Sequence, residues 1–95
     1  MTALIFIAIT SSACPPCHAL HKDFADDPRV QWASADDAGV RERYRVRSVP
    51  VVIAVRDGQE IGRRVGYKGK DDLERWMQSM QDRQNPSPAP IRRRF

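Results

Sequence analysis

Cys14 and Cys17 are the only cysteines in this 95-residue sequence, and two prolines separate them. The apolar run before them predicts a strand, and the segment after them predicts a helix. Two cysteines spaced in this way at a helix start are typical of thiol–disulfide exchange. A purely structural disulfide across so short a gap would stabilise the fold little, because it closes almost no loop. We therefore expect the pair to carry out chemistry.

Two other kinds of site use the same residue types. Cys14-x-x-Cys17-His18 matches the attachment motif of c-type haem, with a methionine of the last helix as a second ligand. With His21 added, the segment also holds four residues of zinc-ligand type. The haem alternative requires a mostly helical, exported protein, and the zinc alternative crowds every ligand onto one proline-restricted helix start. We expect no metal, and no cofactor beyond a Cys14–Cys17 redox-active disulfide.

Length and composition indicate one small globular domain. Charged residues make up 29% of the chain and hydrophobic residues 41%. Three arginines of the net charge of +4 lie in the acid-free stretch over 84–95, so the basic balance is a weak argument for nucleic acid. No apolar run is long enough to span a membrane, and the N-terminal run is short and has no preceding Lys or Arg. We expect a cytoplasmic protein with a folded domain over 1–82 and a disordered Pro/Arg-rich tail over 83–95.

Hydrophobic periodicity predicts an α/β order of elements, β-α-β-α-β-β-α. Strands are expected over 2–9, 30–35, 51–55 and 60–65, with Asp57-Gly58 as a hairpin turn between the last two. Helices are expected from the prolines after Cys14 to the stretch before Asp26, then after an Asp36 or Asp37 cap, and finally beyond Gly69. The first two strands should be parallel, with a right-handed crossover. These elements predict a four-stranded mixed sheet flanked by helices.

This order, with C-x-x-C after the first strand, resembles the thioredoxin fold. The segment over 43–50 is similar to the thioredoxin stretch that ends in a cis-proline, here Pro50. Residues 55–60 resemble the hairpin that follows, and Val65-Gly66-Tyr67 resembles the step after the last strand. The resemblance covers residues 3–82. It implies a compact version that lacks the N-terminal strand and helix of most thioredoxins, as glutaredoxins do.

The resemblance also implies roles for individual residues. Cys14 would be the nucleophile and Cys17 the resolving cysteine. The adjoining His18 is a candidate for tuning the pair. The groove that holds a substrate segment would be formed by Ala13, Pro15, Val49, Pro50 in the cis form, Val65 and Gly66.

Some positions depart from the thioredoxin pattern. Ala13 replaces the usual tryptophan, and Ala8 replaces a buried aspartate that assists proton transfer. The segment after Gly66 lacks the Gly-Gly that glutaredoxins use to bind glutathione.

The resemblance implies a small dithiol–disulfide oxidoreductase that reduces protein disulfides. The alternatives are a glutathione-dependent, glutaredoxin-like enzyme and a non-catalytic binding adaptor. The expected partners are disulfide-containing proteins and an electron donor, either a reductase or glutathione. We expect a monomer that binds neither nucleic acid nor membranes.

Overall fold

The computed structural model describes residues 4–84. The elements are β1 (Leu4–Thr10), α1 (Pro15–Phe24), β2 (Val30–Ser34), α2 (Ala38–Tyr44), β3 (Val51–Arg56), β4 (Gln59–Val65) and α3 (Lys70–Gln84). This order confirms the predicted α/β sequence of elements. Helix α3 continues through Gln84, two residues into the segment predicted as tail. Residues 1–3 and 85–95 lie outside the described residues, and the arginines of the tail are among them.

The four strands form one mixed sheet in the order β2-β1-β3-β4. β1 runs parallel to β2, with Ala8 opposite Trp32, and antiparallel to β3. β3 and β4 form an antiparallel hairpin whose turn residues Asp57 and Gly58 have φ values of 53° and 82°. Two successive positive φ values are what a tight type I′ hairpin turn requires, so the Asp-Gly pair fits its position. The predicted sheet is confirmed, with β1 at its centre.

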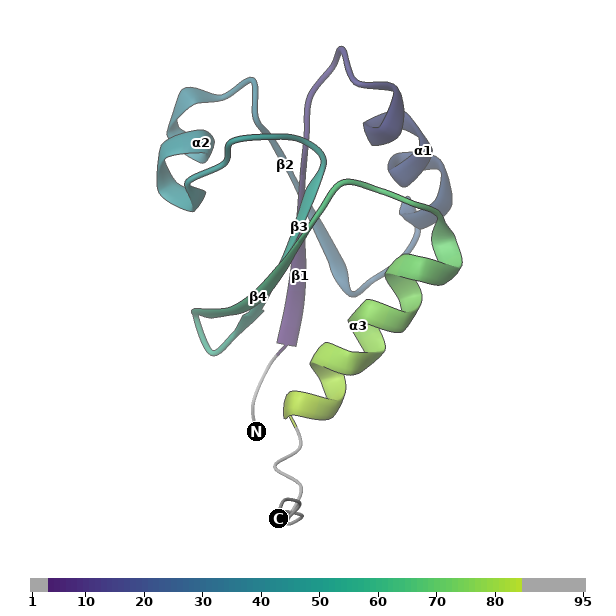
Figure 1. The fold of residues 1–95 in the computed structure, drawn as a ribbon. Coiled ribbons are helices and arrows are strands. Elements are labelled where there is room, and N and C mark those ends of the chain that lie inside the picture. Colours follow the sequence, from purple (N-terminus) through teal and green to yellow (C-terminus); the bar gives the residue numbers. More distant parts are fainter. Residues whose placement is uncertain (1–3, 85–95) are drawn as a thin grey trace.

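Helices cover both faces of this sheet, with α1 and α3 on one side and α2 on the other (Figure 1). Strand β1 supplies core residues to both sides because successive side chains point to opposite faces, which explains why its sequence is apolar nearly throughout. The core under α1 and α3 consists of Phe6, Ala8, Leu20, Phe24, Val52, Ala54, Leu73, Met77 and Met80. The core under α2 consists of Ile7, Ile9, Ala35, Val51 and Ile53.

Helix α3 turns a stripe of apolar side chains toward the sheet. Leu73, Met77 and Met80 are buried, as their helical spacing requires. Trp76 is only partly buried at the rim of the core, where its ring meets the ring of Phe6 edge-on at 5.8 Å. On the surface of the helix, Trp76 lies beside the row formed by Leu73, Met77 and Met80. Its large ring therefore covers the edge of the core and does not fill it.

Helix α2 covers only part of its face of the sheet. It has seven residues, so it lies over the upper part of the sheet in Figure 1. Below it, a hollow of about 550 Å³ is floored by Ile5, Ile7, Ile53 and Val55. Ile5 is accordingly only half-buried.

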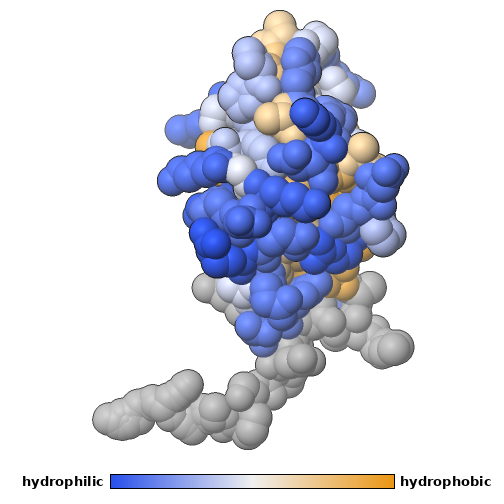
Figure 2. All heavy atoms as spheres, turned by 90° about the vertical axis from the view of Figure 1, so that its right-hand side faces the viewer, coloured by the Kyte–Doolittle hydropathy of each residue, from blue (hydrophilic) through white to orange (hydrophobic). Residues whose placement is uncertain are grey.

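The side of the molecule that carries α1 and α3 has a largely hydrophilic surface (Figure 2). Its helices are amphipathic and turn their apolar stripes to the sheet. Within residues 4–84, no helix combines the length and the apolar character needed to cross a bilayer.

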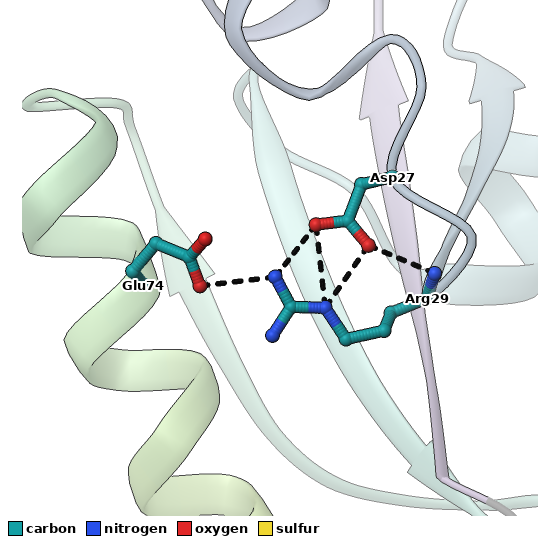
Figure 3. A network of polar contacts seen from close by, with 3 residues as sticks. All are labelled: Asp27, Arg29 and Glu74. Atoms are coloured by element: carbon teal, nitrogen blue, oxygen red, sulfur yellow. Dashed lines mark hydrogen bonds and ion pairs between the residues drawn. The ribbon is translucent and has the colours of Figure 1, made fainter.

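An ion-pair network joins the turn between α1 and β2 to helix α3 (Figure 3). The Arg29 guanidinium donates from Nε and Nη2 to the Asp27 carboxylate, at 2.9 Å to Oδ1 and 2.6 Å to Oδ2. Nη2 also donates to Glu74 Oε1 at 2.9 Å. The Asp27 side chain is only 14% exposed, so solvent screens this pair less than a fully exposed one. The network therefore fixes α3 against the end of α1.

We expect Asp27→Asn to reduce the acid sensitivity of the fold. The hydrogen bonds from Arg29 hold the pKa of Asp27 below its usual value. A lowered folded-state pKa means that this stabilisation is complete above about pH 4–5 and is lost as the pH falls through the lowered pKa. Urea titrations at pH 6 and pH 3 should show a loss in unfolding free energy that is about 1 kcal/mol larger in wild type than in Asp27→Asn.

The matched control is Asp26→Asn, because Asp26 is exposed and has no ion pair within residues 4–84. It should keep the wild-type difference between pH 6 and pH 3. Equal acid sensitivity in wild type and Asp27→Asn would show that the Arg29 pair contributes nothing to stability.

Candidate active site

Cys14 occupies the N-cap of α1. Strand β1 ends at Thr10, a short loop follows, and Cys14 has extended backbone angles (φ −149°, ψ 101°) where the helix begins. Pro15 and Pro16 fill the first helical positions, where a missing N–H costs little. The first helical N–H is therefore that of Cys17, and it points to Cys14 Sγ at 3.2 Å. The sulfur lies where the helix dipole and this donor both stabilise negative charge.

The two cysteines are joined by a disulfide, with their Cα atoms 5.2 Å apart. They differ in accessibility: Cys14 is 6% exposed, whereas Cys17 is fully buried. A partner molecule reaches a residue with some exposed surface more readily than a fully buried one, so this difference suits Cys14 as the attacking group. The roles of the two cysteines stay predictions.

The predicted groove residues meet at the same end of the sheet as the cysteines. Ile9 of β1 lies opposite Val51 of β3, so the residues beyond them, Thr10 and Pro50, adjoin. The Val49–Pro50 peptide bond is cis. The loops before α1 and before β3 therefore lie at the same end of the sheet (Figure 1).

The step after β4 completes this end. The Gly66 N–H donates to the Pro50 carbonyl at 2.7 Å, which ties the two loops together. Gly66 has a φ of 86°, a left-handed conformation that glycine adopts without strain. Val65 is 57% exposed, and among the described residues it is the exposed large apolar side chain. Ala13 and Pro15 are also exposed, whereas Val49 is half-buried and Pro50 is buried.

The two histidines of α1 make different contacts. His18 Nε2 lies 3.1 Å from the Ser12 carbonyl oxygen, so its exposed ring braces the loop before Cys14. His21 Nε2 lies 3.0 Å from the hydroxyl oxygen of Thr10, and its ring stacks on Trp32 with centroids 4.1 Å apart. His21 thus joins α1 to the ends of β1 and β2. The tuning role of His18 stays a prediction.

Sequence reasoning missed a hydrogen bond between α1 and the loop after β4. The Tyr67 hydroxyl donates to Asp23 Oδ2. Burial, together with this contact to Asp23, raises the pKa of Tyr67, so the hydroxyl remains protonated and able to donate. No local motif signals the pair, because its members lie 44 residues apart.

The interior beneath α1 is apolar at Ala8, the position at which the resemblance places a buried aspartate in thioredoxins. Ala8 is fully buried, and every member of the core cluster around it is apolar. The Cys17 thiol of the reduced pair therefore has no carboxylate in that cluster to accept its proton.

Two features of the structure bear on the alternative uses of the cysteines. The haem alternative required a mostly helical protein, whereas a four-stranded sheet forms the centre of this one. Across the described part of the chain, no three side chains among His, Cys, Asp and Glu are grouped to hold a metal ion.

A family model described as a thioredoxin-like domain matches residues 2–81. The chain belongs to the thioredoxin-like family. The match runs from the start of β1 well into α3, so it includes the Cys14–Cys17 pair and Pro50. Membership indicates a thioredoxin-like redox function for this cysteine pair.

Relatives with a thioredoxin name support this assignment. The thioredoxin of Chlamydia trachomatis serovar D is 35% identical over 79 residues, which cover 76% of this chain and 78% of that protein. Thioredoxin H2-1 of Oryza sativa subsp. japonica is 30% identical over 86 residues, covering 83% of this chain and 62% of the rice protein.

Solved structures confirm the thioredoxin fold. A solution structure of a thioredoxin from Thermus thermophilus has a TM-score of 0.68 at 18% identity and covers 86% of this chain and 76% of that one. The reduced thioredoxin of Schistosoma mansoni also has a TM-score of 0.68, at 20% identity, with coverage of 81% and 78%. At these identities the likeness concerns the fold alone.

Proposed function

We propose that this thioredoxin-like protein is a dithiol–disulfide oxidoreductase that reduces disulfides in other proteins. The observation that carries the proposal is the position of Cys14 Sγ, at a helix N-cap and facing the Cys17 N–H at 3.2 Å. Such a site favours the thiolate, which is the nucleophile in disulfide exchange. The second sulfur, needed to complete the reaction, is one helical turn away and already bonded to the first.

The reaction starts from the reduced pair. The Cys14 thiolate attacks one sulfur of the partner's disulfide, a mixed disulfide forms, and the other partner sulfur leaves as a thiolate. Cys17 then loses its proton and attacks Cys14 Sγ, which releases the partner's second sulfur. Two electrons have passed to the partner, whose sulfurs take up two protons, and Cys14–Cys17 is oxidised. A reductase or glutathione would return the pair to the dithiol form.

A substrate segment would lie in the groove beside the pair. An extended chain can pair with the backbone of Val49, in the manner of a strand added to a sheet edge. The exposed side chains of Ala13, Pro15 and Val65 would flank it. Gly66 adds no side chain to this surface, which keeps the approach open.

We propose that the protein acts in the cytoplasm and that it acts as a monomer.

The proposed function is tested by trapping partners on Cys17→Ser. Without the Cys17 sulfur the mixed disulfide cannot resolve, so partner proteins should accumulate covalently on Cys14. Affinity capture under non-reducing conditions, followed by elution with dithiothreitol and mass spectrometry, should identify them. The control is the Cys14→Ser/Cys17→Ser double variant, which should capture none of these proteins covalently.

Absence of any reducible adduct on Cys17→Ser would remove the support for exchange and favour a binding adaptor. Recycling of the oxidised wild type by glutathione, compared with recycling by a thioredoxin reductase, then identifies the class of electron donor.

A further inference from the structure

We propose that the groove beside the cysteine pair prefers protein segments with a carboxylate close to the attacked cysteine, and that Arg45 and Arg47 bind that carboxylate. The inference rests on the proposed exchange function and names its substrate class. A hollow of about 190 Å³ lies beside the predicted groove. The hollow is lined by Arg45, Arg47, Ser48, Val51, Arg63 and Val65.

The hollow is lined by residues on both sides of the Val49–Pro50 step and by a residue of the neighbouring strand. Ser48 and Val51 bracket the Val49–Pro50 step in sequence, and Val65 lies opposite Val51 in the sheet. A segment paired with Val49 would therefore run directly past this hollow. Side chains of an extended segment alternate in direction at about 3.3 Å per residue, so every second side chain of that segment would point to the same side.

Two of the three arginines are available to a ligand. Within residues 4–84, the side chains of Arg45 and Arg47 are exposed and make no hydrogen bond or ion pair. Arg63 is different, because its guanidinium donates to the Glu60 carboxylate at 2.7 Å and to the Tyr44 carbonyl at 2.8 Å. The charge of Arg63 is thus largely neutralised, whereas the charges of Arg45 and Arg47 are not.

The neighbouring arginines of the same segment are occupied by the fold. Arg41 Nε donates to the Ala35 carbonyl at 2.7 Å, and the Arg43 guanidinium lies 5.4 Å from the ring centroid of Tyr44. All four arginines of this segment are exposed, and the first two also contact other groups of the fold, whereas Arg45 and Arg47 make no such contact within residues 4–84.

The backbone also holds Arg45 in an unusual position. It ends α2 with φ 54° and ψ 51°, in the left-handed region where glycine or asparagine is the common residue. Keeping an arginine there sets the side chain at the turn into the Pro50 loop. Unfavoured backbone geometry of this kind is concentrated at functional positions.

Carboxylates suit this hollow chemically. A guanidinium donates two parallel N–H groups to one carboxylate, which adds direction to the charge attraction.

The test uses short peptides with a single cysteine that carries a 2-thiopyridyl mixed disulfide, flanked on both sides by Glu, Gln or Lys. Attack by Cys14 on the peptide sulfur releases 2-thiopyridone, which is followed by its absorbance. With the reduced wild-type protein at low salt, the Glu peptide should react roughly tenfold faster than the Lys peptide. In 1 M salt, where the screening length is about 3 Å, the preference should nearly disappear.

Arg45→Gln/Arg47→Gln should reduce the Glu-to-Lys ratio to about twofold at low salt. The matched control, Lys22→Gln/Arg75→Gln, removes two exposed charges elsewhere and should keep the wild-type ratio. A ratio that falls equally in both variants would attribute the preference to net charge and overturn the proposal. Equal wild-type rates for all peptides would also overturn it and leave the exchange function standing, whereas no reaction with any peptide would count against that function itself.

Discussion

Replacing Cys14 with serine should lower the rate of disulfide reduction by more than about a thousandfold. Cys14 keeps some exposed surface, whereas Cys17 is fully buried. A hydroxyl at this position stays protonated at neutral pH and cannot form the mixed disulfide, and loss of a nucleophile costs factors of this size in other enzymes. Reduction of insulin disulfides, with dithiothreitol as the electron source, measures the rate directly.

Cys17→Ser is the comparison that separates the two sulfurs. It should keep the first attack within about tenfold of wild type in a single turnover, because Cys14 and its helix N-cap remain. It should fail to complete repeated cycles, because no internal thiol resolves the mixed disulfide. If Cys14→Ser attacked substrates and Cys17→Ser did not, the proposed order of attack would be reversed.

Replacing Phe24 with alanine should cost about 3–5 kcal/mol of unfolding free energy. Phe24 is 1% exposed at the last turn of α1, and its ring meets the Tyr67 ring edge-on at 6.3 Å. Truncation would leave a cavity between α1, α3 and the sheet. A domain of this size has about 5–10 kcal/mol in total, so the variant should be close to its stability limit. Urea denaturation followed by tryptophan fluorescence measures the change.

Phe24→Leu provides a graded control, since it keeps most of the buried volume. It should cost about 1–1.5 kcal/mol and remain fully folded in the absence of urea. A cost below 1 kcal/mol for the alanine variant would mean that α1 is held mainly by its polar contacts.

Much of the fold could be predicted from the sequence because its signals are local. The apolar run of β1, the Asp57-Gly58 turn and the helical spacing of Cys17, Leu20 and Phe24 each depend on neighbours within one element. The structure confirms these elements to within a few residues. Local signals of this kind do not predict that three separate loops form the groove. That prediction came from the resemblance to thioredoxins.

What the sequence did not reveal depends on contacts between distant residues. Arg29 and Glu74 lie 45 positions apart, and nothing in either neighbourhood marks them as partners. The four alternating arginines of the α2–β3 segment look equivalent in sequence. Only the fold separates Arg41, which is held by a backbone carbonyl, from Arg45 and Arg47, which are not held.

The position of α3 has a consequence for how the protein is made. Leu73, Met77 and Met80 of this helix form one wall of the larger core, yet α3 leaves the ribosome after every strand has emerged. Until then, α1 alone covers that face of the nascent sheet, and Phe6 and Val52 lack the part of their packing that α3 provides. An exposed apolar sheet face of this kind is a target for chaperones and for aggregation. Folding of this domain is therefore completed only when its last helix has been synthesised.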